Sequence, residues 1–184
     1  ACGLGSGPTP VGPGAIASAE AARATTGRVR SLALQARPIQ ADLGGRRVIT
    51  KTNGDSVPGP ILRATAGDRI QIAFTNDLPE ATSVHWHGLA IRNDMDGVPG
   101  LTTPEVSTSG EFAFDFVVPD PGTHWFHPHS GLQLDRGLYA PFIVDDRDEP
   151  GTYDTEWVIV LDDWTHDVGP SPEQIYADLQ AAGE

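Results

Sequence analysis

Apolar and polar residues alternate over several short stretches of this chain. Residues 70–74 and 112–117 carry an apolar side chain at every second position. Successive side chains of a β-strand point to opposite faces of the sheet, so this pattern predicts strands with one buried face. Three further stretches are extended and β-prone, at residues 29–34, 47–52 and 61–62. We therefore expect a chain built from many short strands.

Two other stretches, residues 138–144 and 157–161, are apolar at nearly every position. This composition is typical of strands that are buried on both faces. Glycine and proline separate the strand-like stretches, as at residues 58–60 (PGP) and 119–122 (PDPG), and favour turns there. Only residues 171–182 have a helical pattern, with Ser171 as the N-cap and a proline in the first turn. The chain is thus predicted to be an all-β sandwich or barrel with a short C-terminal helix.

The N-terminal segment differs in composition from the rest. Residues 1–27 are mostly Gly, Pro, Ala and Ser with little apolar periodicity, which predicts a disordered, flexible leader. The length of 184 residues suits one domain with tails. We therefore divide the chain into the leader at residues 1–27, one β-domain at residues 28–165, and a linker with a short helix at residues 166–184.

The one cysteine, Cys2, excludes an internal disulfide. A small residue, then Cys2, then a Gly/Ser/Pro-rich stretch is typical of a bacterial lipoprotein processing site, at which Cys2 would carry a lipid anchor. This interpretation predicts an extracytoplasmic protein that is periplasmic, secreted or held at the cell surface. A chance cysteine or a cloning remnant explains the same residues equally well. No stretch approaches the roughly 18 apolar residues that a membrane-spanning helix needs.

The net charge of −13 is distributed unevenly. Residues 1–93 hold ten basic and six acidic residues, whereas residues 94–184 hold two basic and nineteen acidic ones. A surface this acidic repels phosphate backbones, which argues against a nucleic acid partner. It could gather cations at low salt, but we favour a solvated face that keeps the protein soluble.

Four of the six histidines form two His-x-His pairs, His85 with His87 and His127 with His129. Residues i and i+2 of a strand project from the same face, about 7 Å apart along the backbone. Two such strands side by side would offer four imidazoles to a cluster of metal ions. Imidazole suits zinc, copper, iron and nickel, and Cu²⁺ binds most tightly among the divalent ions. Ligand type therefore favours copper without excluding zinc.

Two segments around these pairs resemble the copper-binding signatures of multicopper oxidases. Residues 85–100 (HWHGLAIRNDMDGVPG) resemble the first signature, and residues 121–146 (PGTHWFHPHSGLQLDRGLYAPFIVDD) resemble the second. Residues 57–76 are similar to the strands that precede the first signature in that family. The resemblance extends over about residues 28–165 and identifies the chain as the N-terminal cupredoxin domain of a laccase-like multicopper oxidase. It implies a cupredoxin-like (plastocyanin-like) Greek-key β-sandwich.

The resemblance also implies a ligand set for a trinuclear copper cluster. His85 would bind the type 2 copper, His87 and His127 would share one type 3 copper, and His129 would bind the other. The assembled enzyme would reduce dioxygen to water while oxidising phenols, aromatic amines or cuprous ion. Asp96 matches an acidic residue of the first signature, and would orient copper-bound water and relay protons. An ordinary Asp-Gly turn is the alternative for Asp96.

Two parts of the family pattern are absent from the chain. No further His-x-His pair follows Ile143, and no His/Cys/His set is available for a type 1 copper. The type 1 copper and the remaining ligands are therefore expected from further cupredoxin domains, in the same polypeptide or in another. We interpret His124 as structural or supporting, His166 as solvated and Trp125 as a wall of the cluster.

Two functions of other classes stay open from the residues alone. A non-catalytic extracytoplasmic copper-binding module would need no type 1 copper, so the missing ligands favour it. A zinc hydratase or hydrolase could use one His-x-His pair with a third histidine, although the second pair is then partly unexplained.

Overall fold

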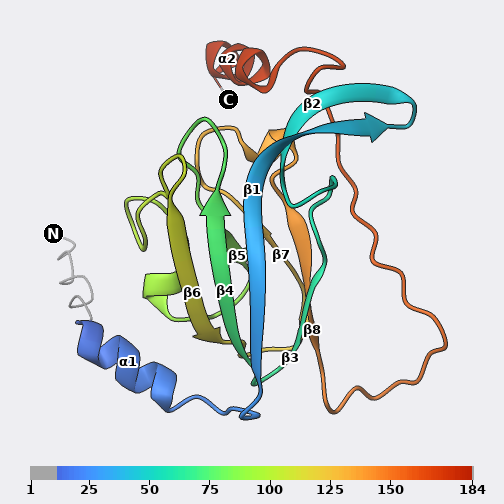
Figure 1. Ribbon diagram of the computed structural model, residues 1–184. Helices are drawn as coiled ribbons and strands as arrows, with labels where there is room; N and C mark the ends of the chain where they lie inside the picture. Colours follow the sequence, from blue (N-terminus) through green and yellow to red (C-terminus); the bar gives the residue numbers. More distant parts are fainter. Residues whose placement is uncertain (1–11, 184) are drawn as a thin grey trace, which may run out of the picture.

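The computed structural model describes residues 12–183, which form two four-stranded sheets packed face to face (Figure 1). The first sheet has the strand order β2-β1-β4-β6 and the second has the order β3-β8-β7-β5. The all-β sandwich expected from the sequence is thereby confirmed. The strands are β1 (Val29–Leu43), β2 (Arg46–Asn53), β3 (Leu62–Thr65), β4 (Arg69–Asn76), β5 (His85–His87), β6 (Glu111–Val117), β7 (Gly122–His127) and β8 (Ala140–Asp145).

Each sheet combines antiparallel and parallel pairing. The long strand β1 pairs antiparallel with β2 through its second half and parallel with β4 through its first half. In the second sheet β3 and β8 are parallel, whereas β7 pairs antiparallel with both β8 and β5. Strands that are neighbours in a sheet are therefore often distant in sequence. This topology places the short strand β5 at one edge, directly beside β7.

The core lies between the two sheets, and Trp86 is at its centre. This side chain is completely buried, and its ring centroid lies 5.1 Å from that of Phe114 and 5.4 Å from that of Phe126. Phe142 completes the surroundings from β8, at 6.0 Å. Because Trp86 points inward, its neighbours His85 and His87 must point to the outer face of the sheet. Burial of one large ring thus orients the first histidine pair.

A helix, α1 (Pro13–Ala21), lies in the segment predicted to be a disordered leader, so that prediction is wrong for these residues. The helix has Pro13 in its first turn and is rich in alanine, the residue with the highest helix propensity. No residue of α1 is fully buried. A pattern search for an apolar stripe therefore could not find it. Residues 1–11, including Cys2, lie outside the described part of the chain.

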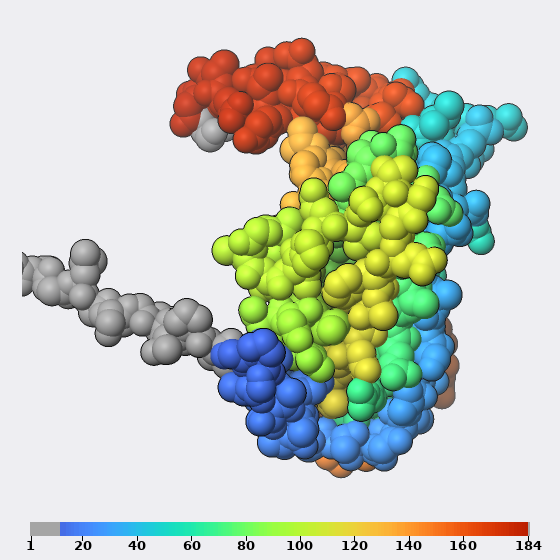
Figure 2. All heavy atoms as spheres, turned by 60° about the vertical axis from the view of Figure 1, so that its left-hand side comes forward, coloured from blue at the N-terminus to red at the C-terminus, as the bar shows by residue number. Residues whose placement is uncertain are grey.

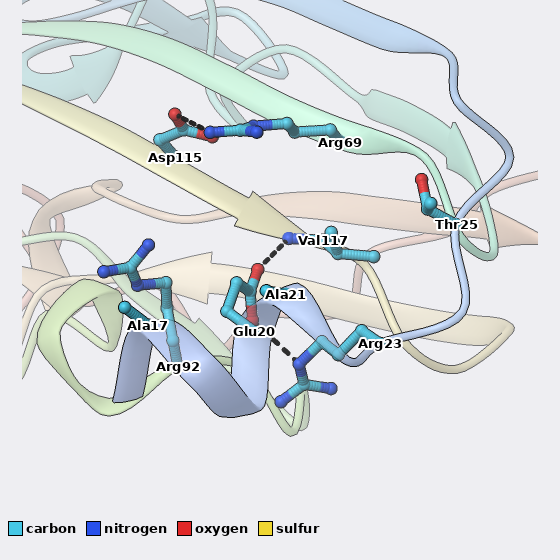
Figure 3. Close-up of a pocket in the computed structure, with 9 residues that line it drawn as sticks. All are labelled: Ala17, Glu20, Ala21, Arg23, Thr25, Arg69, Arg92, Asp115 and Val117. Atoms are coloured by element: carbon cyan, nitrogen blue, oxygen red, sulfur yellow. Dashed lines mark hydrogen bonds and ion pairs between the residues drawn. The ribbon is translucent and has the colours of Figure 1, made fainter. Parts of the chain in front are cut away.

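Polar contacts hold α1 against the edge of the first sheet. The Glu20 carboxylate accepts a hydrogen bond from the main-chain N–H of Val117 in β6, at 2.6 Å. Arg23 donates to the carbonyl oxygen of Ala90 at 2.7 Å. It also pairs with Glu20 at 2.8 Å, and Figure 3 shows Glu20 between Arg23 and Val117. Figure 2 shows the helix lying against β6 and the loop that precedes it. Glu20 thereby satisfies a donor on an edge strand, which would otherwise face solvent.

The second apolar run, residues 157–161, is not the buried strand that its composition predicted. Trp157, Ile159 and Leu161 are 80%, 69% and 91% exposed. Among residues 12–183 no strand pairs with this segment, which is part of the long connection outside the sandwich in Figure 1. The composition predicts that both faces of this segment are covered, but residues 12–183 leave Trp157, Ile159 and Leu161 exposed. The prediction was therefore wrong for this chain because the covering partner is not among those residues.

The predicted C-terminal helix is confirmed as α2 (Pro172–Ala182). The Ser171 hydroxyl accepts the main-chain N–H of Gln174 at 3.2 Å, as an N-cap does. Within the described range, no helix has the length and apolar character needed to cross a membrane.

Candidate metal centre

The pairing of β5 with β7 brings the two histidine pairs together. His85 lies directly opposite His127 in the antiparallel register, and His87 lies opposite Trp125. Phe126 faces the core in β7 as Trp86 does in β5, so the histidines share the outer face of the second sheet. His129 follows Pro128, beyond the end of β7. The second histidine pair therefore lies at the end of a strand.

Four imidazoles form one compact group, here called the histidine cluster: His85, His87, His127 and His129. One ligand nitrogen from each of the first three lies within 4.8 Å of the others. The closest pair is His87 Nδ1 and His127 Nε2, 3.1 Å apart. The ring of His129 is centred 4.8 Å from that of His85 and 5.1 Å from that of His127. All four predicted metal-binding residues are therefore brought together.

Main-chain carbonyl groups fix the tautomers of two of these rings. Nδ1 of His85 lies 2.8 Å from the carbonyl oxygen of Asp96, and Nδ1 of His127 lies 3.0 Å from that of Pro128. A carbonyl oxygen only accepts hydrogen bonds, so each Nδ1 must carry the proton. Nε2 of each ring is then free to bind a metal ion. This is the usual arrangement of a metal-binding histidine, whose second nitrogen is held by a carbonyl or carboxylate.

The electrostatics of the second histidine pair, His127 and His129, favour neutral rings. Burial, and to a smaller extent the nearby histidines, lower the pKa of His127 to about 4 against the opposing effect of the Pro128 carbonyl. Burial also lowers the pKa of His129, with His85 acting in the same direction. A metal ion binds the neutral imidazole. The donor set therefore fits a copper ion or a group of copper ions, since imidazole is a preferred copper ligand.

The predicted proton relay, Asp96, lies at the edge of the histidine cluster. It follows the 3-10 helix η1 (Asn93–Met95), and its carboxylate Oδ1 is 3.5 Å from His85 Nδ1. The next residue, Gly97, has a left-handed φ of 81°, and a Cβ atom there would lie 1.7 Å from the carbonyl oxygen of Val84. Only glycine permits this contact between the loop and β5. Asp96 is thus held next to His85 by both its main chain and its neighbour.

Trp125 covers one side of the histidine cluster. Its ring stacks on His127 with centroids 4.2 Å apart at an angle of 28°, and it lies 4.9 Å from His87. The other side of Trp125 lines a cavity of about 450 Å³ that residues 158–163 partly enclose. Because Trp125 contacts the rings of both His127 and His87, it limits how these two imidazoles can rotate.

The two remaining histidines lie outside the histidine cluster. His124 packs against Gly88 and Gly122, where the missing side chains leave room for its ring. The interpretation of His166 as solvated is wrong. Its side chain is only 14% exposed, and its Nε2 lies 3.0 Å from the carbonyl oxygen of Ile49. The ring is partly buried because Trp164, two residues earlier, packs against Gly137 and brings the segment onto the domain.

Sequence reasoning did not find the buried polar residues beside the histidine cluster. Thr82 and Ser83 directly precede β5, and Ser130 and Gln133 follow the second histidine pair. In sequence they look like ordinary turn residues. The one feature of the sequence that could have pointed to Ser83 is its spacing, because it stands two positions before His85 and residues two apart in a strand share a face.

These observations define a class of protein, a two-sheet β-sandwich with a histidine cluster on its outer face that could hold a metal ion. A sequence profile for the family described as "Multicopper oxidase" matches residues 34–149. The chain is 54% identical over 165 residues to multicopper oxidase MmcO of Mycobacterium tuberculosis, covering 90% of this chain and 32% of that protein. It is 45% identical over 116 residues to copper resistance protein A of Escherichia coli, covering 62% and 19%. The chain belongs to the multicopper oxidase family.

Solved structures of the family have the same fold. A multicopper oxidase from Pseudomonas thermotolerans superposes with a TM-score of 0.62 at 35% identity, covering 65% of this chain and 30% of that one. A laccase from Botrytis aclada gives a TM-score of 0.62 at 33% identity, covering 66% and 23%. The cupredoxin-like fold is therefore confirmed. The chain spans about a third or less of the length of these relatives.

Proposed function

We propose that this chain supplies four histidines to a trinuclear copper cluster of a laccase-like oxidase. The observation that carries the proposal is the opposed pairing of two His-x-His segments in one sheet, His85 against His127. Three ligand nitrogens within 4.8 Å of one another suit ions that share ligands in one cluster. A zinc hydrolase would leave the second pair unexplained and does not agree with the family.

We assign the ligands as follows. His87 and His127 share one type 3 copper, because their facing nitrogens are 3.1 Å apart and both can lie about 2 Å from one ion. His129 binds the second type 3 copper. His85 binds the type 2 copper through Nε2, since its Nδ1 is engaged by Asp96.

When bound, the three coppers would pass to dioxygen the four electrons that reduce it to water, and the reducing substrate would supply these electrons through the type 1 copper of another domain. The protein's own residues orient the imidazoles, lower the pKa of His127 and His129 and, through Trp125, shield one side. We propose a small reducing substrate, namely a phenol, an aromatic amine or cuprous ion. Relatives with lower similarity include proteins named laccase and L-ascorbate oxidase, which supports a small reducing substrate in general.

We propose further cupredoxin domains as partners, in the same polypeptide or in another. They would supply the type 1 copper, since Cys2 is the one cysteine of the chain and belongs to the predicted leader. The β-domain proper would be residues 28–165, and the exposed residues 157–161 would pack against the next domain. Trp157, Ile159 and Leu161 have the apolar character of such an interface.

The location follows from the same family assignment. We propose that the protein acts outside the cytoplasm, in the periplasm, at the cell surface or in secreted form. A lipid anchor at Cys2 would tether it through the leader.

We propose that Asp96 moves protons and does not bind metal. Reduction of dioxygen to water consumes four protons, and the Asp96 carboxylate lies beside His85 at the edge of the histidine cluster. In an enzyme assembled with its other domains, Asp96→Asn should keep the full copper content while turnover falls about 10- to 100-fold, as for other residues that contact metal ligands. The loss should deepen as pH rises, because protons become scarcer. Loss of one copper per molecule would instead make Asp96 a ligand.

Copper binding by the chain, measured by equilibrium dialysis and electron paramagnetic resonance, tests the proposed function. We expect nitrogen-coordinated Cu²⁺, weakened by His85→Ala or His127→Ala and unaffected by His166→Ala, which removes a histidine outside the cluster. Oxygen uptake with a phenol or Cu⁺ should stay at the level of free copper, because the chain has no type 1 site. Vigorous four-electron reduction of dioxygen by this chain alone would contradict the proposal.

A further inference from the structure

Four buried polar side chains connect the two segments that carry the histidine cluster: Thr82, Ser83, Ser130 and Gln133. Residues 82–83 precede β5, and residues 130–133 follow the second histidine pair. A polar group without a hydrogen bond is costly to bury, so such groups are retained where they make specific contacts. Here the contacts join one copper-binding segment to the other.

Ser83 makes the contact nearest to the metal-binding residues. Its Oγ accepts the main-chain N–H of His129 at 2.8 Å and the hydroxyl of Ser130 at 3.2 Å. Ser83 is only 4% exposed, so water does not readily replace these bonds. The hydroxyl of one residue thus holds the backbone on which the fourth imidazole stands.

Gln133 reinforces this junction. Its Oε1 accepts the hydroxyl of Thr82 at 2.6 Å, and its Nε2 donates to the carbonyl oxygen of Ala81 at 2.8 Å. A weaker bond joins the same Nε2 to Glu80 at 3.3 Å. Five hydrogen bonds therefore link residues 80–83 to residues 129–133.

The hydrogen bonds between β5 and β7 do not fix the position of His129. The register between β5 and β7 ends at the pair His85 and His127, and Pro128 has no N–H with which to continue it. His129 stands beyond that end, and within residues 12–183 its main-chain N–H bonds to Ser83. The position of the fourth ring relative to the other three thus depends on a side chain outside the ladder.

We propose that Ser83 is a positioning residue that fixes the imidazole of His129 against the other three histidines, with Thr82 and Gln133 as its support. The inference rests on the proposed function, because it treats His129 as a copper ligand. It adds a residue that binds no metal and touches the ligand only through the backbone. Pre-organisation of this kind matters because a metal site loses affinity when a ligand must be ordered on binding.

The first test uses the metal-free chain, with the imidazole C–H signals of its histidines observed by nuclear magnetic resonance. Ser83→Ala should shift and broaden the His129 signal and leave that of His166 unchanged. Ser83→Thr keeps the hydroxyl and should restore most of the signal. The matched control is Thr52→Ala. It removes an equally buried hydroxyl from β2 of the first sheet, where Thr52 donates to the main-chain carbonyl of Ser56. It should leave His129 unaltered.

The second test uses Cu²⁺ alone as the probe. The loss of copper affinity in His129→Ala measures how much His129, the proposed fourth ligand, contributes to binding. Ser83→Ala should weaken that contribution about tenfold, which is the lower end of the effect of residues that hold a ligand in place. Ser83→Thr should recover most of it, and Thr52→Ala should not reduce it.

The outcomes separate the two claims. A folded Ser83→Ala chain with an unchanged His129 signal and unchanged copper affinity would overturn the positioning role. If His129→Ala leaves copper binding intact while Ser83→Ala disturbs the His129 ring, positioning stands and the assignment of His129 as a ligand fails. Should Ser83→Ala not fold, Gln133→Ala removes the supporting bonds, and an unperturbed His129 ring in that variant would equally overturn the proposal.

Discussion

At the scale of single residues, the histidine cluster depends on close contacts that only particular side chains allow. Gly97 is the clearest case, because its Cα lies against the carbonyl of Val84, one residue before His85. This approach carries the Asp96 carbonyl to within 2.8 Å of the His85 ring. The loop therefore orients a proposed copper ligand through backbone atoms, which no search for catalytic side chains would find.

Replacement of Gly97 by alanine should disturb the His85 ring. The new Cβ would lie 1.7 Å from the Val84 carbonyl oxygen, so the loop must move and the hydrogen bond that His85 Nδ1 donates to the Asp96 carbonyl must lengthen. We expect weaker copper binding and a lower melting temperature. Gly100→Ala is the control, since Gly100 also has a left-handed φ, of 78°, but faces open space. It should cost only the backbone strain of about 1–2 kcal/mol. Equal effects of the two changes would argue against a specific role for Gly97.

At the scale of elements, the predictable parts of the fold are those that carry their own pattern. The strands β4 and β6 were predicted because their apolar residues alternate, and α2 because Ser171 caps it. The two histidine pairs were located because the period of a strand places residues i and i+2 on one face. The contact between them needed the resemblance to a known family, since pairing of β5 with β7 is not visible in a local pattern.

The errors at this scale have physical causes. Helix α1 was not predicted because it docks through Glu20 and Arg23 and not through an apolar stripe. Residues 157–161 were predicted to be buried because their apolar composition favours burial, but composition does not show whether another element is present to cover them. Ser83 and Gln133 escaped notice because burial of a polar residue is decided by the tertiary structure.

The contact between the leader and the sandwich yields a prediction about acid stability. The side chain of Asp68 is fully buried and accepts hydrogen bonds from Thr26 at 2.8 Å and from Arg28 at 3.0 Å. Burial opposes its ionisation, but these hydrogen bonds outweigh burial and lower its pKa. A carboxyl whose pKa is lower in the folded state stabilises the fold above its unfolded pKa of about 3.9, and this stabilisation is lost as pH falls through the folded value.

Asp68→Asn should therefore reduce the free energy of unfolding by about 2 kcal/mol at pH 7, the order expected for hydrogen bonds to a buried charge. The difference from the unaltered chain should begin to shrink as pH falls below about 3.9, the pKa of Asp68 in the unfolded chain, and should disappear below the lower pKa of folded Asp68. Urea unfolding at several pH values measures this. Asp120→Asn, at an exposed carboxylate, is the control and should have little effect at any pH. A deficit that stays constant down to pH 2 would show that charge on Asp68 is not the cause.

At the scale of the whole molecule, the acidic sandwich exposes one apolar strip, formed by Trp157, Ile159 and Leu161. These three side chains alternate with Val158 and Val160 in a segment outside the sheets, and residues 158–163 line the cavity beside Trp125. An extended segment that is apolar on both faces is suited to lie between two sheets. The strip is thus where we expect the next domain to pack.

The chain alone should therefore self-associate through this strip at high concentration. Changing Trp157, Ile159 and Leu161 together to serine should reduce the self-association seen in sedimentation velocity while leaving the far-ultraviolet circular dichroism unchanged. Ile49→Ser is the control, since Ile49 is 68% exposed but stands apart from the strip, on β2. A chain that is monomeric at all concentrations, or a triple variant that associates as before, would contradict this use of the strip.

The central claim is that these four histidines hold copper on the outer face of the second sheet. The most direct measurement is anomalous X-ray scattering at the copper edge from crystals of the copper-loaded chain. We predict a peak beside His85, His87 and His127, at the face covered by Trp125, with any further copper within reach of His129. Copper bound only at the acidic surface, or no peak among these imidazoles, would contradict the account.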